Sequence, residues 1–295
     1  MGISEEIKLS YQKGSYYTKL IYLNIGTFLL IWIISLFYKD IQQWVAIPGT
    51  FKELIYKPWT LISYMFVHAG FMHLFSNMLM LFWFGRLFMQ FLHNKQLLAV
   101  YLLGGFVGAF IHLGSNYLIP ENQRIGIIGA SGAVMAIVFA VSSFKPNYII
   151  NLIFIGPVKL KYIALVAFII DLMGLASDLK AVGLGSGVAH FAHIGGALYG
   201  LWFGVEMRRG KDISKWFGVV LNETFSFFQS SGNKTKMKIE KGNNSYVHRP
   251  KTDAEYRQTK AASNEELDKI LDKISKTGYE SLTNEEKKFL FNQKK

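Results

Sequence analysis

Six long apolar segments constrain this chain more than any other feature of its sequence. A helix needs about 20 apolar residues to cross the hydrocarbon core of a bilayer, and it satisfies its own backbone hydrogen bonds there. We therefore predict an all-α, polytopic membrane protein with a bundle of six transmembrane helices. The segments cover about residues 20–38, 61–84, 97–119, 127–143, 161–177 and 188–206.

Charged residues divide the chain into a membrane part and a polar tail. They make up 18% of the sequence, and residues 207–295 hold 19 of the 32 Lys and Arg and 12 of the 20 Asp and Glu. We predict five parts: a cytosolic N-terminal segment over 1–19, a membrane domain over 20–206, an interfacial amphipathic segment over 207–229, a flexible basic linker over 230–262 and a small helical hairpin over 263–295.

Two shorter stretches carry local predictions. The apolar run Ile149–Gly156 is expected to be an interfacial segment that ends at Pro157, or a tilted start to the fifth helix. In the tail hairpin, Ser263 and Glu266 have the spacing of a capping box, and we expect them to begin its first helix. Gly278 can end that helix, and Thr283 with Glu286 repeats the capping pattern before the second one.

Basic residues in the short loops predict the orientation. With both termini in the cytoplasm, 12 Lys and Arg near the helix ends fall inside and five fall outside. The net charge of +12 lies largely beside the membrane, where it favours anionic lipid headgroups. We therefore expect membrane lipids, and not nucleic acid, as partners. Cysteine is absent, which excludes a thiol nucleophile and a thiolate metal site.

Three polar clusters lie inside the apolar segments. They are His73-Leu74-Phe75-Ser76-Asn77, Gly129-Ala130-Ser131-Gly132 and His190-Phe191-Ala192-His193. Polar side chains at membrane depth are costly, so each cluster is a candidate functional site. The second, fourth and sixth helices run in the same direction, so all three clusters should lie in one leaflet.

The residue types suggest acyl transfer. Ser131 needs a base to become a nucleophile, and the imidazole of His193 suits that task. The Ser131 backbone N–H, the Asn77 amide and a His73 N–H could stabilise an oxyanion. We expect the Ser131 hydroxyl within bonding reach of the His193 ring. His190, about one turn earlier, is a weaker candidate for a direct catalytic role.

No carboxylate is expected at the depth of these clusters. Asp171 and Asp178 are placed near the outer end of the fifth helix and in the loop after it. We therefore predict a Ser131–His193 dyad whose imidazole is held by packing. The glycines beside the clusters allow close approach of backbones: Gly129 and Gly132 beside the serine, and Gly196 and Gly200 on the sixth helix.

The sequence resembles the rhomboid family of intramembrane serine proteases. The resemblance rests on Pro58-Trp59-Thr60, Phe66-x-His68-x4-His73-x3-Asn77, Gly129-Ala130-Ser131-Gly132 and Ala192-His193-x2-Gly196-x3-Gly200, and it covers about residues 55–206. It implies that Ser131 is the nucleophile, His193 the general base, His73 and Asn77 the oxyanion-stabilising residues, and His68 a structural histidine. Met135 stands where some relatives carry a tyrosine.

The resemblance also implies substrates and a location. The substrates would be single-pass membrane proteins that are cut in or near the bilayer, with no cofactor and no metal. The six-helix form with a tail resembles bacterial members, so we expect the bacterial inner membrane, with an unknown partner for the terminal hairpin. Two alternatives stay open. One is a non-catalytic relative that binds membrane helices. The other is a zinc site or metal transporter that uses His68, His73, His190 and His193.

Overall fold

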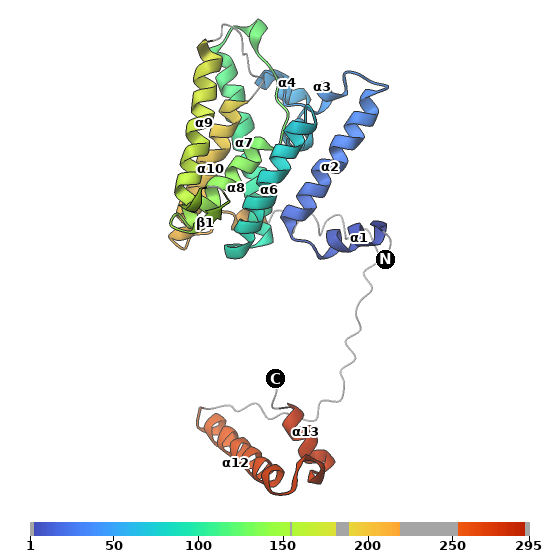
Figure 1. Ribbon diagram of the computed structural model, residues 1–295, viewed down its shortest axis with the longest axis vertical. Helices are drawn as coiled ribbons and strands as arrows, with labels where there is room; N and C mark the ends of the chain where they lie inside the picture. The colour runs from blue at the N-terminus through green and yellow to red at the C-terminus, as the bar shows by residue number, and fades with distance from the viewer. Residues whose placement is uncertain (1–2, 154, 181–188, 219–252, 293–295) are drawn as a thin grey trace. The chain divides into compact units, whose positions relative to one another are not determined.

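The computed structural model describes residues 3–153, 155–180, 189–218 and 253–292, in two compact units, Met1–Gly232 and Asn233–Lys295. The first unit is helical in its described part, apart from one short β-hairpin (Figure 1). Its longer helices are α1 (Ile3–Lys13), α2 (Tyr16–Ser35), α6 (Phe71–Phe91), α7 (Asn94–Ser115), α8 (Ser131–Phe144), α9 (Leu160–Lys180) and α10 (His190–Arg208).

Four of the described helices are long and apolar enough to cross a membrane: Tyr16–Ser35, Phe71–Phe91, Asn94–Leu118 and Leu160–Ser177. Helix α8 is apolar but has only 14 residues, and α10 has 19. The all-α, polytopic character of the chain is therefore confirmed, while the count of six membrane spans stays a prediction.

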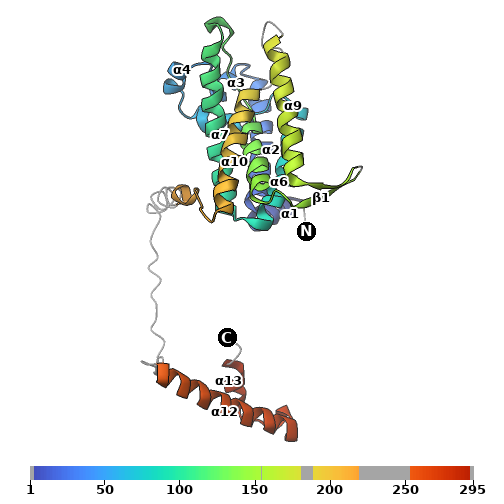
Figure 2. The ribbon, with the colours of Figure 1, turned by 90° about the vertical axis from the view of Figure 1, so that its left-hand side faces the viewer.

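Helix α8 lies at the centre of the first unit. Nine of its 14 residues are buried, and it packs against α10, α7 and α6. Figure 2 shows α10 between α7 and α9. A helix that is apolar on all sides is stable only when neighbours surround it, which explains why so short a helix occupies this position.

Glycines bring α8 and α10 into backbone contact. Gly196, Gly200 and Gly204 of α10 lie against Gly132, Ala136 and Ala140 of α8, so both helices present every fourth residue to the other. A methyl group added to Gly196 would come within 2.8 Å of the Gly132 carbonyl carbon. The small side chains therefore fix the distance between the helix that carries Ser131 and the helix that carries His193.

The segment between α2 and α6 contains short helices and a 3-10 turn. These elements are α3 (Ile41–Val45), α4 (Phe51–Tyr56), α5 (Thr60–Ser63) and the 3-10 turn η1 (Tyr64–Phe66). The second apolar segment was expected to be helical from residue 61, but α6 begins at Phe71 after an extended Gly70. The chain is extended at Val67, which ends the η1 turn and separates it from α6.

A second connection ties this segment to the loop before α8. Ile47 and Ile127 exchange two backbone hydrogen bonds of 3.0 Å as an isolated antiparallel bridge. The side-chain amide of Asn116, in the 3-10 turn η2 (Asn116–Leu118), donates to the carbonyls of Gly49 and Ile125 at 2.9 Å. A further 3-10 turn, η3 (Glu121–Gln123), completes the loop.

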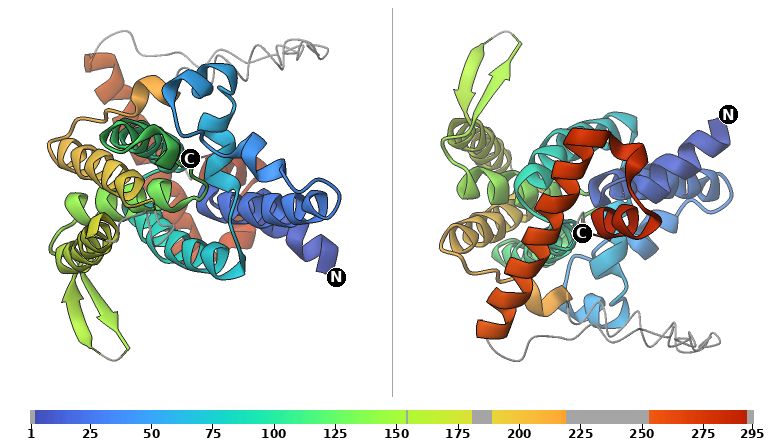
Figure 3. Two further views of the ribbon diagram at one scale, coloured as in Figure 1. Left: turned by 90° about the horizontal axis from the view of Figure 1, so that it is seen from above. Right: turned by 90° about the horizontal axis from the view of Figure 1, so that it is seen from below.

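The run Ile149–Gly156 is not a tilted start to α9, and it does not end at Pro157; its expected position at the membrane interface stays a prediction. Residues 149–152 and 156–159 form an antiparallel hairpin of β1 (Ile149–Leu152) and β2 (Gly156–Lys159). Exposure alternates along both strands, and Gly156 has a φ of +86°, which favours glycine. Pro157 is tolerated because a two-stranded ribbon has free edges. Figure 3 shows the hairpin projecting away from the helices.

The second unit is a helical hairpin, but its first helix starts earlier than expected. Helix α12 (Asp253–Thr277) begins ten residues before Ser263, so Ser263 does not cap it and the predicted linker does not extend to 262. Ala, Lys and Glu favour helix without an apolar stripe, which explains the earlier start. Gly278 does follow the helix end, with a φ of +81°.

A capping box begins the last helix, as predicted. In front of α13 (Asn284–Asn292), Glu286 N–H donates to Thr283 Oγ1 at 3.3 Å, and Thr283 N–H donates to Glu286 Oε2 at 2.6 Å. Between the two helices lies the 3-10 turn η4 (Tyr279–Ser281). The expected interfacial segment 207–229 is described only to residue 218, and most of the expected linker lies outside the described residues.

Candidate active site

One pocket of about 450 Å³ collects the polar residues of three helices. His73 and Asn77 come from α6, Ser131 from α8 and His193 from α10. All four lie in the N-terminal halves of their helices. The lining residues are His73, Ser76, Asn77, Met80, Ile128, Ser131, Val134, Met135, Ala189 and His193.

Ser131 is the first residue of α8, about four positions nearer the helix start than expected. The N–H groups of a first helical turn have no partner within the helix, and the helix dipole favours negative charge beside them. The chain reaches this position through Gly129, whose N–H donates to the Tyr64 carbonyl at 2.9 Å. Gly129 has a φ of +132°, a conformation that side chains disfavour.

His73 lies directly beside Gly129. A methyl group at Gly129 would be 2.8 Å from His73 Nε2 and 3.6 Å from Ser131 Oγ, so the ring nitrogen and the hydroxyl border the same small space. The Ala69 N–H donates to His73 Nδ1 at 3.5 Å, which leaves the ring proton on Nε2. His73 can therefore donate a hydrogen bond toward the space above Ser131.

Asn77 lies one turn after His73 on the same face of α6. Its side-chain amide donates to the His73 carbonyl at 2.8 Å, and this bond uses one of its two N–H groups. The second N–H is available to a group in the pocket. His68 is buried at 2% exposure, and its ring packs edge-on against His73 with 5.0 Å between centroids, which supports a structural role.

The expectation of an imidazole held without a carboxylate was wrong. Asp171 is the twelfth residue of α9, which continues to Lys180, so it lies well inside the helix. Its Oδ1 atom is 2.7 Å from His193 Nδ1 and 2.7 Å from His190 Nδ1. The side chain is buried, with 7% of the residue exposed.

Sequence reasoning missed Asp171 although a signal for it was present. An acidic residue in an apolar helix is costly unless it has a partner or a function. Gly174 lies one turn later and carried no such signal; only the structure shows that a side chain there would come within 2.7 Å of His190 Nε2. The Asp178 side chain lies outside the part that the structure describes.

The structure does not join Ser131 to His193 by a hydrogen bond among the residues it describes, although both side chains line the same pocket. The expected bonding contact is therefore not made in this state. Catalytic hydrogen bonds are often long before substrate binds, so this geometry is compatible with a nucleophile and a base.

The histidines do not assemble into the four-histidine metal site considered above. His190 and His193 join Asp171, and the donor atoms of these three residues lie within 4.8 Å of one another. Two ligands of one zinc ion, each at about 2.0–2.2 Å, would lie more than 3 Å apart. The nitrogen-to-oxygen distances of 2.7 Å are instead those of hydrogen bonds.

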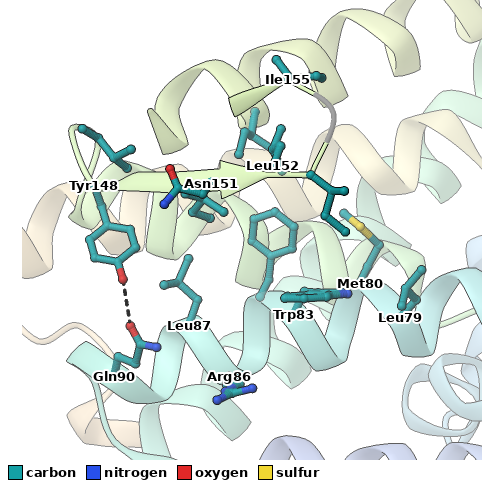
Figure 4. A pocket seen from close by; sticks show the side chains of 15 residues that line it. Leu79, Met80, Trp83, Arg86, Leu87, Gln90, Tyr148, Asn151, Leu152 and Ile155 are labelled. Carbon is teal, nitrogen blue, oxygen red and sulfur yellow. Dashed lines mark hydrogen bonds between the residues drawn. The ribbon is translucent and has the colours of Figure 1, made fainter. Parts of the chain in front are cut away.

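A larger apolar pocket of about 740 Å³ lies between the later part of α6 and strand β1 (Figure 4). Trp83, Leu87 and Leu152 are among its lining residues, and Tyr148 donates to Gln90 Oε1 at 3.3 Å across one side. Its described lining contains no serine, histidine or carboxylate.

The fold and the pocket define a helical, polytopic membrane protein with serine, histidine and asparagine at the starts of three helices. Residues 56–210 match the Rhomboid domain, and residues 251–292 match a family of unknown function (DUF6576). Because the first match covers more than half of the 295 residues, the chain belongs to the rhomboid family.

Curated relatives support this assignment. The chain is 30% identical over 143 residues to presenilin-associated rhomboid-like protein A, mitochondrial, of Danio rerio, covering 47% of this chain and 34% of the relative. It is 35% identical over 147 residues to RHOMBOID-like protein 6, mitochondrial, of Arabidopsis thaliana, covering 50% and 42%. For the human presenilin-associated rhomboid-like protein, mitochondrial, the identity is 28% over 188 residues, covering 63% and 46%. The chain thus spans less than half of each relative's length.

These relatives correct the expected location. We predicted a bacterial inner membrane with both termini in the cytoplasm, but the relatives that match are named as mitochondrial proteins. The basic-residue count does not distinguish between kinds of membrane, because it compares only the two sides of one bilayer. The prediction of a bacterial cell membrane was therefore wrong.

Proposed function

We propose that the chain is an intramembrane serine endopeptidase with Ser131 as nucleophile and His193 as general base. The observation that carries the proposal is the single pocket lined by Ser131, His193, His73 and Asn77 from three separate helices. Rhomboid proteins act on membrane protein substrates, so the substrate is a peptide bond in or near a transmembrane segment. Single-pass membrane proteins are the expected partners.

The reaction uses no external reactant except water. Ser131 Oγ attacks the scissile carbonyl carbon while its proton moves to His193 Nε2. The carbon–nitrogen bond then breaks, and His193 returns the proton to the leaving amine. Water hydrolyses the acyl-enzyme by the same route in reverse, which leaves a carboxylate and restores the serine.

Three groups are suited to the oxyanion of this reaction. They are the N–H of Ser131 at the start of α8, the His73 Nε2–H and the second N–H of Asn77. Fixed donors aimed at developing negative charge are worth about 10²- to 10³-fold each in rate. His68, Gly129, Gly132, Gly196 and Gly200 support the site by packing.

The test compares purified wild-type protein in proteoliposomes with two alanine variants. Ser131→Ala should abolish cleavage of a fluorescent transmembrane peptide and labelling by a fluorophosphonate probe. Ser35→Ala is the matched control, since its exposed hydroxyl donates to the Trp32 carbonyl in α2. Cleavage that persists in Ser131→Ala would refute the proposal. Substrate binding without cleavage by the wild type would favour the non-catalytic alternative.

A further inference from the structure

We propose that Asp171 is a positioning residue that holds His193 in the tautomer with its proton on Nδ1, so that the site is a Ser131–His193–Asp171 triad. This inference rests on the proposed function and adds a third group to it. The carboxylate comes from α9, the serine from α8 and the imidazole from α10. The three groups thus lie on three neighbouring helices.

The hydrogen bonds determine where the protons lie. An ionised carboxylate can only accept, so the Nδ1 atom of each imidazole bonded to Asp171 Oδ1 carries a proton. In a neutral ring the other nitrogen then has the free lone pair. His193 Nε2 is therefore available to take the serine proton, whereas the opposite tautomer could not act as a base.

The carboxylate also stabilises the charged ring that forms during the reaction. When His193 takes the proton from Ser131, an imidazolium arises in a half-buried position, with 14% of its side chain exposed. Asp171 lies 2.7 Å away in a poorly solvated environment, where charge–charge attraction is stronger than in water. The interaction is thus greatest in the transition state, as catalysis requires.

His190 fixes the position of the carboxylate. Its Nδ1–H donates to the same Oδ1 atom at 2.7 Å. This oxygen is therefore held by two donors, His190 and His193, which lie about one turn apart on α10. Gly174 provides the space for the His190 ring, since a side chain at 174 would contact that ring. Helix α9 thus carries two features for this cluster, Asp171 and Gly174, at a spacing of one turn.

A metal ion is the competing explanation for two histidines and an aspartate. The donor atoms are close enough to be drawn together by an ion. Their separations match hydrogen bonds instead, and one oxygen shared by two N–H groups accounts for both of them. The geometry thus favours proton positioning.

The activity test uses Asp171→Asn, with Asp40→Asn as a matched control on an exposed carboxylate. In soluble serine proteases the corresponding change lowers kcat by about 10⁴-fold because the wrong tautomer forms. We expect Asp171→Asn to lower kcat by at least about 100-fold with KM unchanged, and Asp171→Glu to recover part of the loss. The control should retain wild-type kcat. A kcat within about twofold of wild type in a folded Asp171→Asn protein would overturn the proposal.

A second measurement does not depend on activity. Nitrogen NMR of His193 in the Ser131→Ala protein should report the Nδ1–H tautomer, and adding Asp171→Asn should remove that preference. The Nε2–H tautomer in the Ser131→Ala protein would overturn the positioning role even if the wild type cleaves substrate. The expected tautomer, together with a wild-type protein that never cleaves substrate, would instead refute the proposed function. Zinc bound at one equivalent and lost in Asp171→Asn would also overturn the proposal.

Discussion

A single methyl group at Gly196 tests whether the backbone contact between α8 and α10 sets the geometry of the site. The Cβ atom of Gly196→Ala would lie 2.8 Å from the Gly132 carbonyl carbon, and closer still to its oxygen. Carbon atoms at optimal separation are about 3.5–4.0 Å apart, so the two helices must part by roughly 1 Å. Neither atom belongs to a flexible side chain that could move away.

Two opposing effects decide whether Gly196→Ala stabilises or destabilises the protein. Alanine is favoured over glycine inside a helix by about 1 kcal/mol. Overpacking a core costs typically about 1–3 kcal/mol, and the contact here is with backbone, which yields least. A displacement of about 1 Å between nucleophile and base can also lower the rate by about 10²-fold. We therefore expect Gly196→Ala to be destabilised and to lose about 99% of its activity.

The assay measures thermal unfolding and peptide cleavage on the same reconstituted samples. Gly26→Ala in α2 is the control, because an added methyl group meets no atom within 4 Å there. Gly26→Ala should be slightly more stable than wild type, because alanine is favoured over glycine in a helix, and it should keep full activity. If Gly196→Ala were as stable and as active as Gly26→Ala, the argument that glycine contacts fix the site would be refuted.

Two other predictions concern Gly129 and the tail hairpin. Gly129→Ala should lose both cleavage and stability, because its methyl group meets the His73 ring at 2.8 Å and its φ of +132° disfavours a side chain. The Gly114→Ala control, where an added methyl group meets no atom within 4 Å, should keep both. The second prediction concerns the tail. A hydrogen bond from Lys273 is the main reason that the pKa of Glu286 is lowered to about 2, and a hydrogen bond from the Thr283 backbone contributes as well. This lowered pKa gives α13 a stabilisation that is complete above the unfolded pKa of about 4.3 and is lost as the pH falls toward 2. Circular dichroism of the tail from pH 6 to pH 2 should show the loss, and Glu286→Gln should show a smaller loss, because Lys269 also lowers the pKa of Glu265.

The sequence predicts much of the fold because apolar length and residue spacing are local properties. Six apolar segments locate α2, α6, α7, α8, α9 and α10, and the alternating direction of successive helices explains why His73, Ser131 and His193 line one pocket. The i,i+4 spacing places Asn77 on the same face as His73.

The remaining features depend on tertiary structure. Asp171 contacts His193 because of how far α9 extends and how it is rotated, which the composition of one segment does not determine. The run Ile149–Gly156 is too short for periodicity to distinguish strand from helix. The first ten residues of α12 carry no apolar stripe, so their helix could not be recognised from hydrophobic spacing.

The bridge between Ile47 and Ile127 has a consequence for variation within this protein. Ile127 lies four residues before Ser131, and both of its bridging hydrogen bonds are to the backbone of residue 47. An insertion between α2 and α6 that shifts residue 47 would therefore pull on the start of α8, although residue 47 lies 84 positions before Ser131 in sequence. Altered length in that connection would change how firmly the reactive hydroxyl is held, without touching any residue of the pocket.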